Sequence, residues 1–155
     1  MSARVWQADE EDVELVAGLL AGFRDHMGKD VPTDDEIRAT AAVLLQDSAT
    51  EFLLAAPDGQ DAAAGVCQLR YRLAIWTGTD DCWLEDLFVR SDARRSGLGR
   101  ALVTGAFERA RARGCRRIDL DVNEDNANAL ALYREMGFTT EPKPPGRTLY
   151  VMRRI

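Results

Sequence analysis

The chain has 155 residues, 46% of them hydrophobic and 30% charged, and a formal net charge of −6 at pH 7. These values fit one globular domain over residues 1–155 that is large enough to fold without a disulfide or a metal. No run of about 18 apolar residues occurs, which excludes a membrane-spanning helix. The first residues lack the apolar core of a secretory signal peptide, so we expect a cytoplasmic protein with no membrane partner.

The charge is divided unevenly along the chain. Residues 1–93 hold 7 Lys/Arg and 19 Asp/Glu, a net charge of −12, whereas residues 94–155 hold 13 and 7, a net charge of +6. Such a division suits two ligands of opposite charge, although unevenness also arises by chance or for solubility. The overall acidity and the small basic part predict no nucleic-acid partner.

The three cysteines, Cys67, Cys82 and Cys115, are odd in number and far apart, and the chain has one histidine, His26. Neither a CxxC pair nor a Cys/His cluster with zinc-ligand spacing occurs. We therefore expect three reduced thiols, most of them packed inside the protein, and no metal site.

The hydrophobic pattern predicts both strands and helices. We expect strands at residues 5–8, 51–56, 63–76, 82–90, 117–122, 138–141 and 147–153. Helical spacing of apolar residues predicts helices at residues 13–23, 33–45, 98–113 and 126–136. In chain order, these elements predict an α/β or α+β fold with one central mixed sheet of about seven strands, flanked by about four helices.

Local signals mark where these helices begin or end. Asp9 is a candidate N-cap, and the acidic residues after it suit a helix N-terminus. Thr33 begins a Thr-Asp-Asp-Glu capping box. Gly114 and Gly137 follow the third and fourth helices, where glycine commonly ends a helix.

The segment Arg94–Gly99 reads Arg-Arg-Ser-Gly-Leu-Gly and joins an expected strand to a long helix. The first N–H groups of a helix lack internal partners and the helix dipole adds partial positive charge, so this junction favours an anion. Gly97 and Gly99 let a bulky phosphate approach the backbone. Arginines in and beside the segment add full positive charges. The segment predicts a pyrophosphate site, with a merely structural turn as the alternative, and it matches neither the Rossmann fingerprint nor the P-loop.

This segment resembles the coenzyme A-binding signature of the GNAT acetyltransferases, (Gln/Arg)-x-x-Gly-x-(Gly/Ala), with Arg94, Gly97 and Gly99 at the specified positions. A second segment resembles the Asn…Leu-Tyr…Gly-Phe segment of the same family. It reads Asn126-x-x-Ala129-x-x-Leu132-Tyr133-x-x-x-Gly137-Phe138. The resemblance is close over residues 82–138 and implies the GNAT fold, with a mostly antiparallel sheet, and acetyl-CoA as the co-substrate.

In this family the pantetheine arm of the coenzyme pairs with the backbone of the strand before the turn. The pyrophosphate lies on the amides of the turn and of the helix that follows. The residues implied to bind the coenzyme here are Leu87, Val89, Arg94, Arg95, Ser96, Gly97, Leu98, Gly99, Arg100 and Asn126. Many relatives carry glycine where this chain has Arg95. Asn126 is also a candidate helix N-cap, and the two roles are compatible.

Acetyl transfer requires a neutral amine, a donor for the oxyanion and a proton for the departing thiolate. Tyr133 matches the family tyrosine that protonates the coenzyme sulfur, and its alternative is a packed aromatic side chain. The segment 84–89 resembles the polyamine and diamine acetyltransferase branch, which implies Glu85 as the base, acting directly or through water. Strand alternation places Glu85 and Asp86 on opposite faces of the sheet unless a bulge intervenes. The alternative for each carboxylate is that it is simply solvated and has no catalytic role.

The acidic N-terminal part favours a small cationic acceptor, such as a polyamine, a diamino acid or an aminoglycoside. In relatives the first two helices and their loop form part of the acceptor wall. His26 lies there, either as a second base or as a solvated or packed side chain. Two further hypotheses stay open: acetylation of a protein N-terminus or lysine, and a non-catalytic acyl-CoA-binding module. The resemblance also implies a homodimer.

Overall fold

The computed structural model describes residues 2–140, 145–146 and 148–155. These residues form two compact units, Met1–Asp121 and Val122–Ile155. The first unit holds the whole sheet and three α-helices, and the second holds one α-helix. A single domain over residues 1–155 stays a prediction.

The first unit is built on a five-stranded sheet in the order β1-β2-β3-β4-β5. Its strands are β1 (Arg4–Gln7), β2 (Thr50–Ala56), β3 (Gly65–Leu73), β4 (Asp80–Val89) and β5 (Ile118–Asp119). The first four strands pair antiparallel, and β5 pairs parallel with β4. The sheet is mixed and mostly antiparallel, which confirms the predicted fold class.

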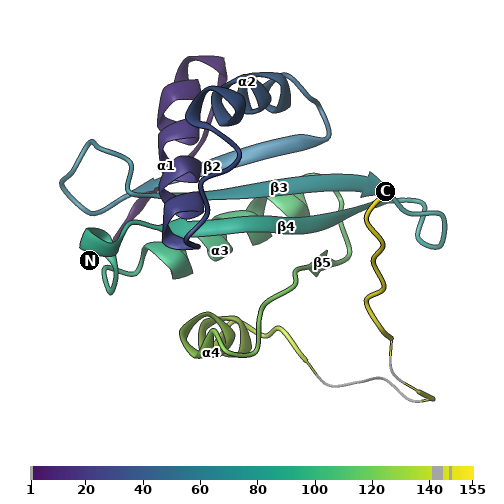
Figure 1. Ribbon diagram of the computed structural model, residues 1–155. Helices are drawn as coiled ribbons and strands as arrows, with labels where there is room; N and C mark the ends of the chain where they lie inside the picture. Colours follow the sequence, from purple (N-terminus) through teal and green to yellow (C-terminus); the bar gives the residue numbers. More distant parts are fainter. Residues whose placement is uncertain (1, 141–144, 147) are drawn as a thin grey trace. The chain divides into compact units, whose positions relative to one another are not determined.

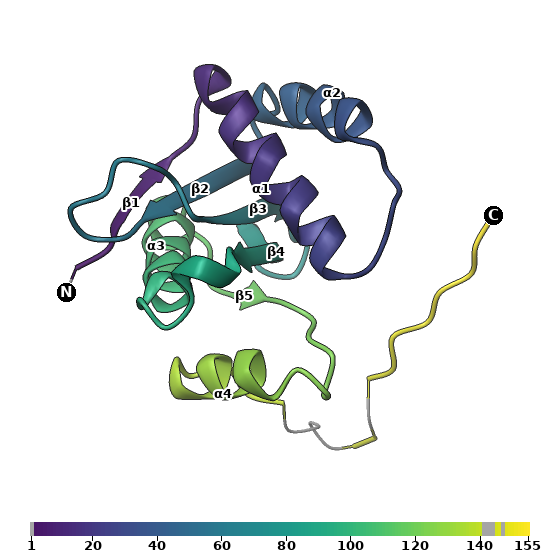
Figure 2. The same cartoon turned by 60° about the vertical axis from the view of Figure 1, so that its left-hand side comes forward.

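Helices cover both faces of this sheet (Figure 1, Figure 2). One face carries α1 (Val13–His26) and α2 (Asp34–Leu45), and the opposite face carries α3 (Leu98–Ala112). Two short 3-10 turns, η1 (Glu10–Asp12) and η2 (Ser91–Ala93), come just before α1 and α3 in the chain. Within the described residues, the helices are too short or too polar to cross a membrane.

Strand alternation gives each face of the sheet its own apolar layer. Phe52, Leu54, Val66 and Phe88 belong to the buried cluster that packs against α1 and α2. On the other face α3 approaches the backbone closely, because Gly65 has no side chain: a Cβ there would stand 3.1 Å from Leu102 Cδ1. This close packing fixes α3, and with it the turn before α3, against the ends of β3 and β4.

The structure confirms the predicted helix signals at Asp9, Thr33 and Gly114. The Asp9 side chain accepts from the N–H of Glu11 and caps η1, which leads directly into α1. Thr33 and Glu36 form the reciprocal capping box of α2, with donor–acceptor distances of 2.8 and 3.3 Å. Gly114 follows α3 with a φ of 81°, a left-handed conformation that glycine adopts without strain.

A partly buried ion pair also holds α3 against the sheet. The carboxylate of Glu51 on β2 accepts from Arg109 Nε at 2.9 Å, from Arg109 Nη2 at 2.8 Å and from the Tyr71 hydroxyl at 2.9 Å. Burial by itself raises the pKa of Glu51, but these donors outweigh it and hold the pKa below its usual range. The network ties β2, β3 and α3 together.

The second unit contains α4 (Ala127–Glu135), which ends before Gly137 with its φ of 93°. Among the described residues, neither 138–140 nor 148–153 forms a strand. Residues 141 and 147 lie outside the described residues. The prediction of two closing strands, and hence of about seven strands, was therefore wrong for this structure. An alternating pattern of apolar and polar residues is not enough to form a strand, because a strand also needs a neighbouring strand whose backbone completes its hydrogen bonds.

Candidate functional site

The connection between η2 and α3 is a turn with two left-handed residues. Arg95 has a φ of 64° and Gly97, the N-cap of α3, a φ of 80°. The first hydrogen bond of α3 runs from Ala101 N to Gly97 O at 3.0 Å. The earlier N–H groups of α3 therefore point out of the helix end, where they and the helix dipole favour an anion.

The conformation at position 95 gives a reason for the glycine that many relatives carry there. A left-handed φ costs a residue with a Cβ roughly 1–2 kcal/mol, and glycine adopts it without that penalty. Relatives with glycine there avoid this strain, whereas this chain keeps an arginine, Arg95. Strained residues tend to gather at functional sites, and the Arg95 side chain adds a positive charge beside the start of α3.

The strand before the turn has an open backbone edge. β5 pairs with β4 only at Cys82 and Trp83 within the described sheet. Further along β4, the N–H of Arg90 donates to Ala64 O next to β3, at 2.9 Å. Alternate residues of a strand present their backbone groups to opposite edges. The N–H and C=O groups of Leu87 and Val89 therefore face the open edge, where an extended ligand can pair with them.

A bulge in β4 is the exception that the prediction about Glu85 and Asp86 allowed for. The β3–β4 register runs from Gln68↔Asp86 directly to Leu69↔Leu84, so Glu85 is the extra residue of a β-bulge. Glu85 Oε2 lies 3.5 Å from Nη1 of Arg70, the residue after Leu69.

The faces of these side chains follow from their neighbours. Phe88 belongs to the layer that α1 and α2 cover, and Asp86, two residues earlier in regular register, shares its face. Arg70 lies on that same face, because its neighbour Tyr71 points the other way, to Glu51 and Arg109 of α3. Both carboxylates, of Glu85 and Asp86, therefore lie on the α1/α2 face.

The two carboxylates differ in their surroundings. Glu85 is exposed and close to the positive charge of Arg70. Burial raises the pKa of Asp86, and the negative charges of Glu85 and Asp121 raise it further. A raised pKa makes a carboxylate a stronger proton acceptor, so Asp86 is the better placed of the two for base chemistry.

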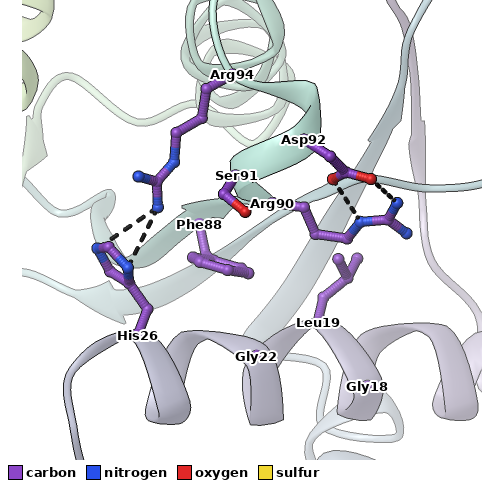
Figure 3. Close-up of a pocket in the computed structure, with 9 residues that line it drawn as sticks. All are labelled: Gly18, Leu19, Gly22, His26, Phe88, Arg90, Ser91, Asp92 and Arg94. Carbon is purple, nitrogen blue, oxygen red and sulfur yellow. Dashed lines mark hydrogen bonds and ion pairs between the residues drawn. The ribbon is translucent and has the colours of Figure 1, made fainter.

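On the same face of the sheet, α1 and the end of β4 line an open pocket of about 360 Å³ (Figure 3). Gly18 and Gly22 of α1 form its floor, and Phe88 lies at its centre. Nη2 of Arg94 lies 3.4 Å from both ring nitrogens of His26 across the pocket. His26 is exposed and contacts an arginine of the turn, which the sequence analysis did not anticipate.

Asn126 and Tyr133 belong to the second unit. The Asn126 side chain accepts from the N–H of Ala129 at 3.2 Å, which confirms the N-cap role. Tyr133 is 8% exposed and meets Phe138 edge to face, with ring centroids 5.6 Å apart. The roles of both residues toward the coenzyme stay predictions.

Residues 18–138 match the sequence profile of the Acetyltransferase (GNAT) family. The chain belongs to this family. The match spans the carboxylates, the open edge and the turn of the first unit, and it extends over α4, so this GNAT chain carries both segments that the sequence analysis singled out.

Two curated relatives illustrate the range of the family. A mycothiol acetyltransferase of Kineococcus radiotolerans is 34% identical over 142 residues, 90% of this chain and 43% of that protein. The chain therefore spans less than half the length of that relative. An aminoglycoside N(6′)-acetyltransferase type 1 of Stenotrophomonas maltophilia is 30% identical over 108 residues, 68% of this chain and 69% of that protein.

Solved structures show the same architecture. A protein of Arthrobacter sp. FB24 with a solved crystal structure is 28% identical to this GNAT chain. It superposes with a TM-score of 0.85 over 98% of this chain and 96% of its own. The agreement covers nearly the full length of both chains and supports the GNAT fold.

Proposed function

We propose that this GNAT chain transfers the acetyl group of acetyl-CoA to a small cationic amine. The observation that carries the proposal is the arrangement along β4. An open backbone edge at Leu87 and Val89 runs into the anion-binding turn, and two carboxylates lie directly upstream. Acetyl-CoA bound along this edge and an amine bound at the carboxylates would meet on the same stretch of β4.

The residues of the turn fit the pyrophosphate of coenzyme A. A Cβ at Gly97 would meet nothing within 4 Å, so the backbone there is open to a bulky ligand. Arg95 brings positive charge, and the outward N–H groups at the start of α3 bring donors. Acetyl-CoA, when bound, supplies the acetyl thioester. Leu87 and Val89 hold its arm through main-chain hydrogen bonds.

The Glu85–Asp86 pair is the proposed base, acting directly or through one water. An alkylammonium ion must lose a proton before its nitrogen attacks, because at neutral pH most of it is protonated. Asp86, with its raised pKa, is the proposed proton acceptor. Glu85 adds the negative charge that raises the pKa of Asp86 and attracts the ammonium group.

Tyr133 is the proposed acid toward the coenzyme sulfur, and Asn126 the proposed partner of the coenzyme arm. Both assignments rest on the family segment that these residues match. A phenol is a proton donor at neutral pH and can still give up its proton, and the Asn126 amide keeps its two N–H donors while its oxygen caps α4.

Charge supports a cationic acceptor. Residues 1–93 carry a net charge of −12, and α1, α2 and both β4 carboxylates belong to that part of the chain. A negative surface around the amine site raises the local concentration of cations. The two relatives differ in acceptor, one named for mycothiol and one for aminoglycosides, so the choice among small amines depends on this chain's own residues.

The test is thiol release from acetyl-CoA by the purified protein in the presence of amines. The panel contains polyamines, diamino acids, aminoglycosides and a lysine-bearing peptide. Release with a free small amine and not with the peptide supports the proposal. Release with the peptide alone indicates a protein acceptor, and tight acetyl-CoA binding without any release indicates a non-catalytic acyl-CoA-binding module.

A further inference from the structure

The pocket between α1 and the end of β4 has a chemistry of its own. Its basic side chains are those of His26, Arg90 and Arg94. Arg90 is already neutralised by Asp92, whose carboxylate accepts from its Nε at 3.0 Å and pairs with its Nη2. Within the described part of the chain, Arg94 contacts the Val89 carbonyl and the His26 ring but no carboxylate. Arg94 therefore keeps its full positive charge beside the pocket.

Two glycines inside a helix line the pocket. Gly18 and Gly22 lie one turn apart on the face of α1 that lines the pocket, and His26 follows one turn later. Glycine within a helix costs roughly 1 kcal/mol relative to alanine. A Cβ at Gly22 would lie 3.2 Å from Phe88 Cε1, so glycine there lets α1 pack closely against Phe88. A Cβ at Gly18 would meet nothing within 4 Å, so close packing does not require glycine at position 18. The missing side chain instead leaves the pocket open.

The pocket also lies on the same side of the sheet as the proposed base. Phe88, at its centre, is two residues beyond Asp86 in regular register. Two residues of a strand span about 7 Å. A molecule whose ammonium group is at Asp86 therefore reaches the pocket with a chain of about the length of a lysine side chain.

We propose that this pocket binds the carboxylate of the acceptor against the adjacent side chains of Arg94 and His26, so that the acceptor is a diamino acid and Arg94 serves the acceptor and not the coenzyme. The inference rests on the proposed function, since it assumes that the acetylated amine is at Glu85 and Asp86. A guanidinium and an imidazole N–H are both donors to carboxylate oxygens. A polyamine has no carboxylate for this pocket, so it lacks the group that Arg94 and His26 would bind.

The experiment measures binding without turnover. L-Lysine and cadaverine differ only in the carboxylate, so their dissociation constants are measured by calorimetry in the presence of coenzyme A. We expect L-lysine to bind at least about tenfold more tightly than cadaverine, a factor typical of one charge-assisted hydrogen bond. Equal affinities, or no binding of either compound, overturn the proposal.

Two variants locate the effect. Gly18→Leu fills the pocket from α1, and His26→Gln removes the imidazole. Each variant should bring the ratio of the two dissociation constants, cadaverine over L-lysine, close to one. Ala39→Leu places the same leucine on an exposed position of α2 that does not line the pocket, and it should keep the preference. A preference that persists in Gly18→Leu contradicts the proposal.

The same titrations distinguish a carboxylate site from a phosphate site. If Gly18→Leu weakens coenzyme A itself, the pocket holds a phosphate of the coenzyme and the proposal is wrong. Thiol release with cadaverine and lysine at equal efficiency removes the carboxylate site but leaves amine acetylation standing. A lysine preference in binding without thiol release from any amine supports the carboxylate site and contradicts the proposed function.

Discussion

Glu85 Oε2 lies 3.5 Å from Arg70 Nη1, on the side of the sheet that α1 and α2 cover. This contact exists because the bulge in β4 adds one residue and turns Glu85 to the face that Asp86 also occupies. The arginine offsets the charge of Glu85, while Asp86, more buried, keeps a raised pKa. Two neighbouring carboxylates thus have different environments, an arrangement that suits proton transfer at one of them.

Replacing the proposed base should change both the rate and its pH dependence. We expect Asp86→Asn to lower kcat/KM about 100-fold, and Glu85→Gln to lower it less, because Arg70 already offsets the charge of Glu85. In the wild type, kcat/KM should fall as the pH drops through the raised pKa of Asp86, where the carboxylate takes up a proton. Asp86→Asn should lose this part of the pH profile.

The control for this series is Glu14→Gln, which removes an exposed carboxylate paired with Arg38 on the surface. Its kcat/KM should equal that of the wild type. An Asp86→Asn variant with an unchanged pH profile contradicts the assignment of Asp86, and a larger loss in Glu85→Gln moves the base to Glu85.

Removing the Tyr133 hydroxyl should slow turnover without weakening coenzyme binding. We expect Tyr133→Phe to lower kcat about 100-fold, because the thiolate then leaves without a proton, while the KM for acetyl-CoA stays within about twofold. Tyr150→Phe is the matched control, since Tyr150 is 92% exposed. Unchanged kcat in Tyr133→Phe removes this residue from the chemistry.

The turn before α3 can be tested at its glycine. Gly97 and Gly78 both have a positive φ, 80° and 66°, with open space where a Cβ would stand. Alanine at either position should therefore destabilise the fold by a similar amount, about 1 kcal/mol. Only Gly97→Ala should also weaken acetyl-CoA binding, measured by calorimetry. Equal acetyl-CoA affinity in the two variants would argue that the turn is merely structural.

The Glu51–Arg109 pair should contribute to stability in a pH-dependent way. Arg109→Ala leaves the Glu51 carboxylate buried with Tyr71 as its remaining donor. We expect a loss of about 2 kcal/mol in unfolding free energy, below the range for fully buried pairs because the Arg109 side chain is 39% exposed. Since the folded-state pKa of Glu51 is lowered, this stabilisation is present at neutral pH and disappears as the pH falls through that pKa.

Denaturant unfolding at several pH values measures this effect. Arg38→Ala, which breaks the exposed pair with Glu14, is the control and should cost less than about 0.5 kcal/mol. A loss in Arg109→Ala that stays constant down to acid pH would show that the Glu51 carboxylate is not its source.

Much of the fold follows from local patterns. The apolar spacing of α1 to α4, the capping box at Thr33 and the glycine after α3 depend on residues within one or two helical turns of each other. The turn at Gly97 is likewise local, because glycine marks the position with a positive φ and the helical pattern begins directly after it. These features were predictable without knowledge of the tertiary structure.

The features that could not be predicted from the sequence depend on contacts between distant parts of the chain. The bulge at Glu85 follows from the register between β3 and β4, which side-chain alternation in one strand does not reveal. The contact of His26 with Arg94 joins residues 68 positions apart. One local signal was present for the pocket, since Gly18 and Gly22 interrupt the apolar stripe of α1 with two glycines one turn apart.

The most direct measurement follows the acetyl group itself. The purified protein is incubated with acetyl-CoA carrying an isotope label in the acetyl group, together with L-lysine, cadaverine and spermidine, and free thiol and labelled amine are quantified by mass spectrometry. Acetyl transfer to an amine predicts one labelled amine for each thiol released. Thiol release without labelled amine, or no release in the presence of bound acetyl-CoA, contradicts it.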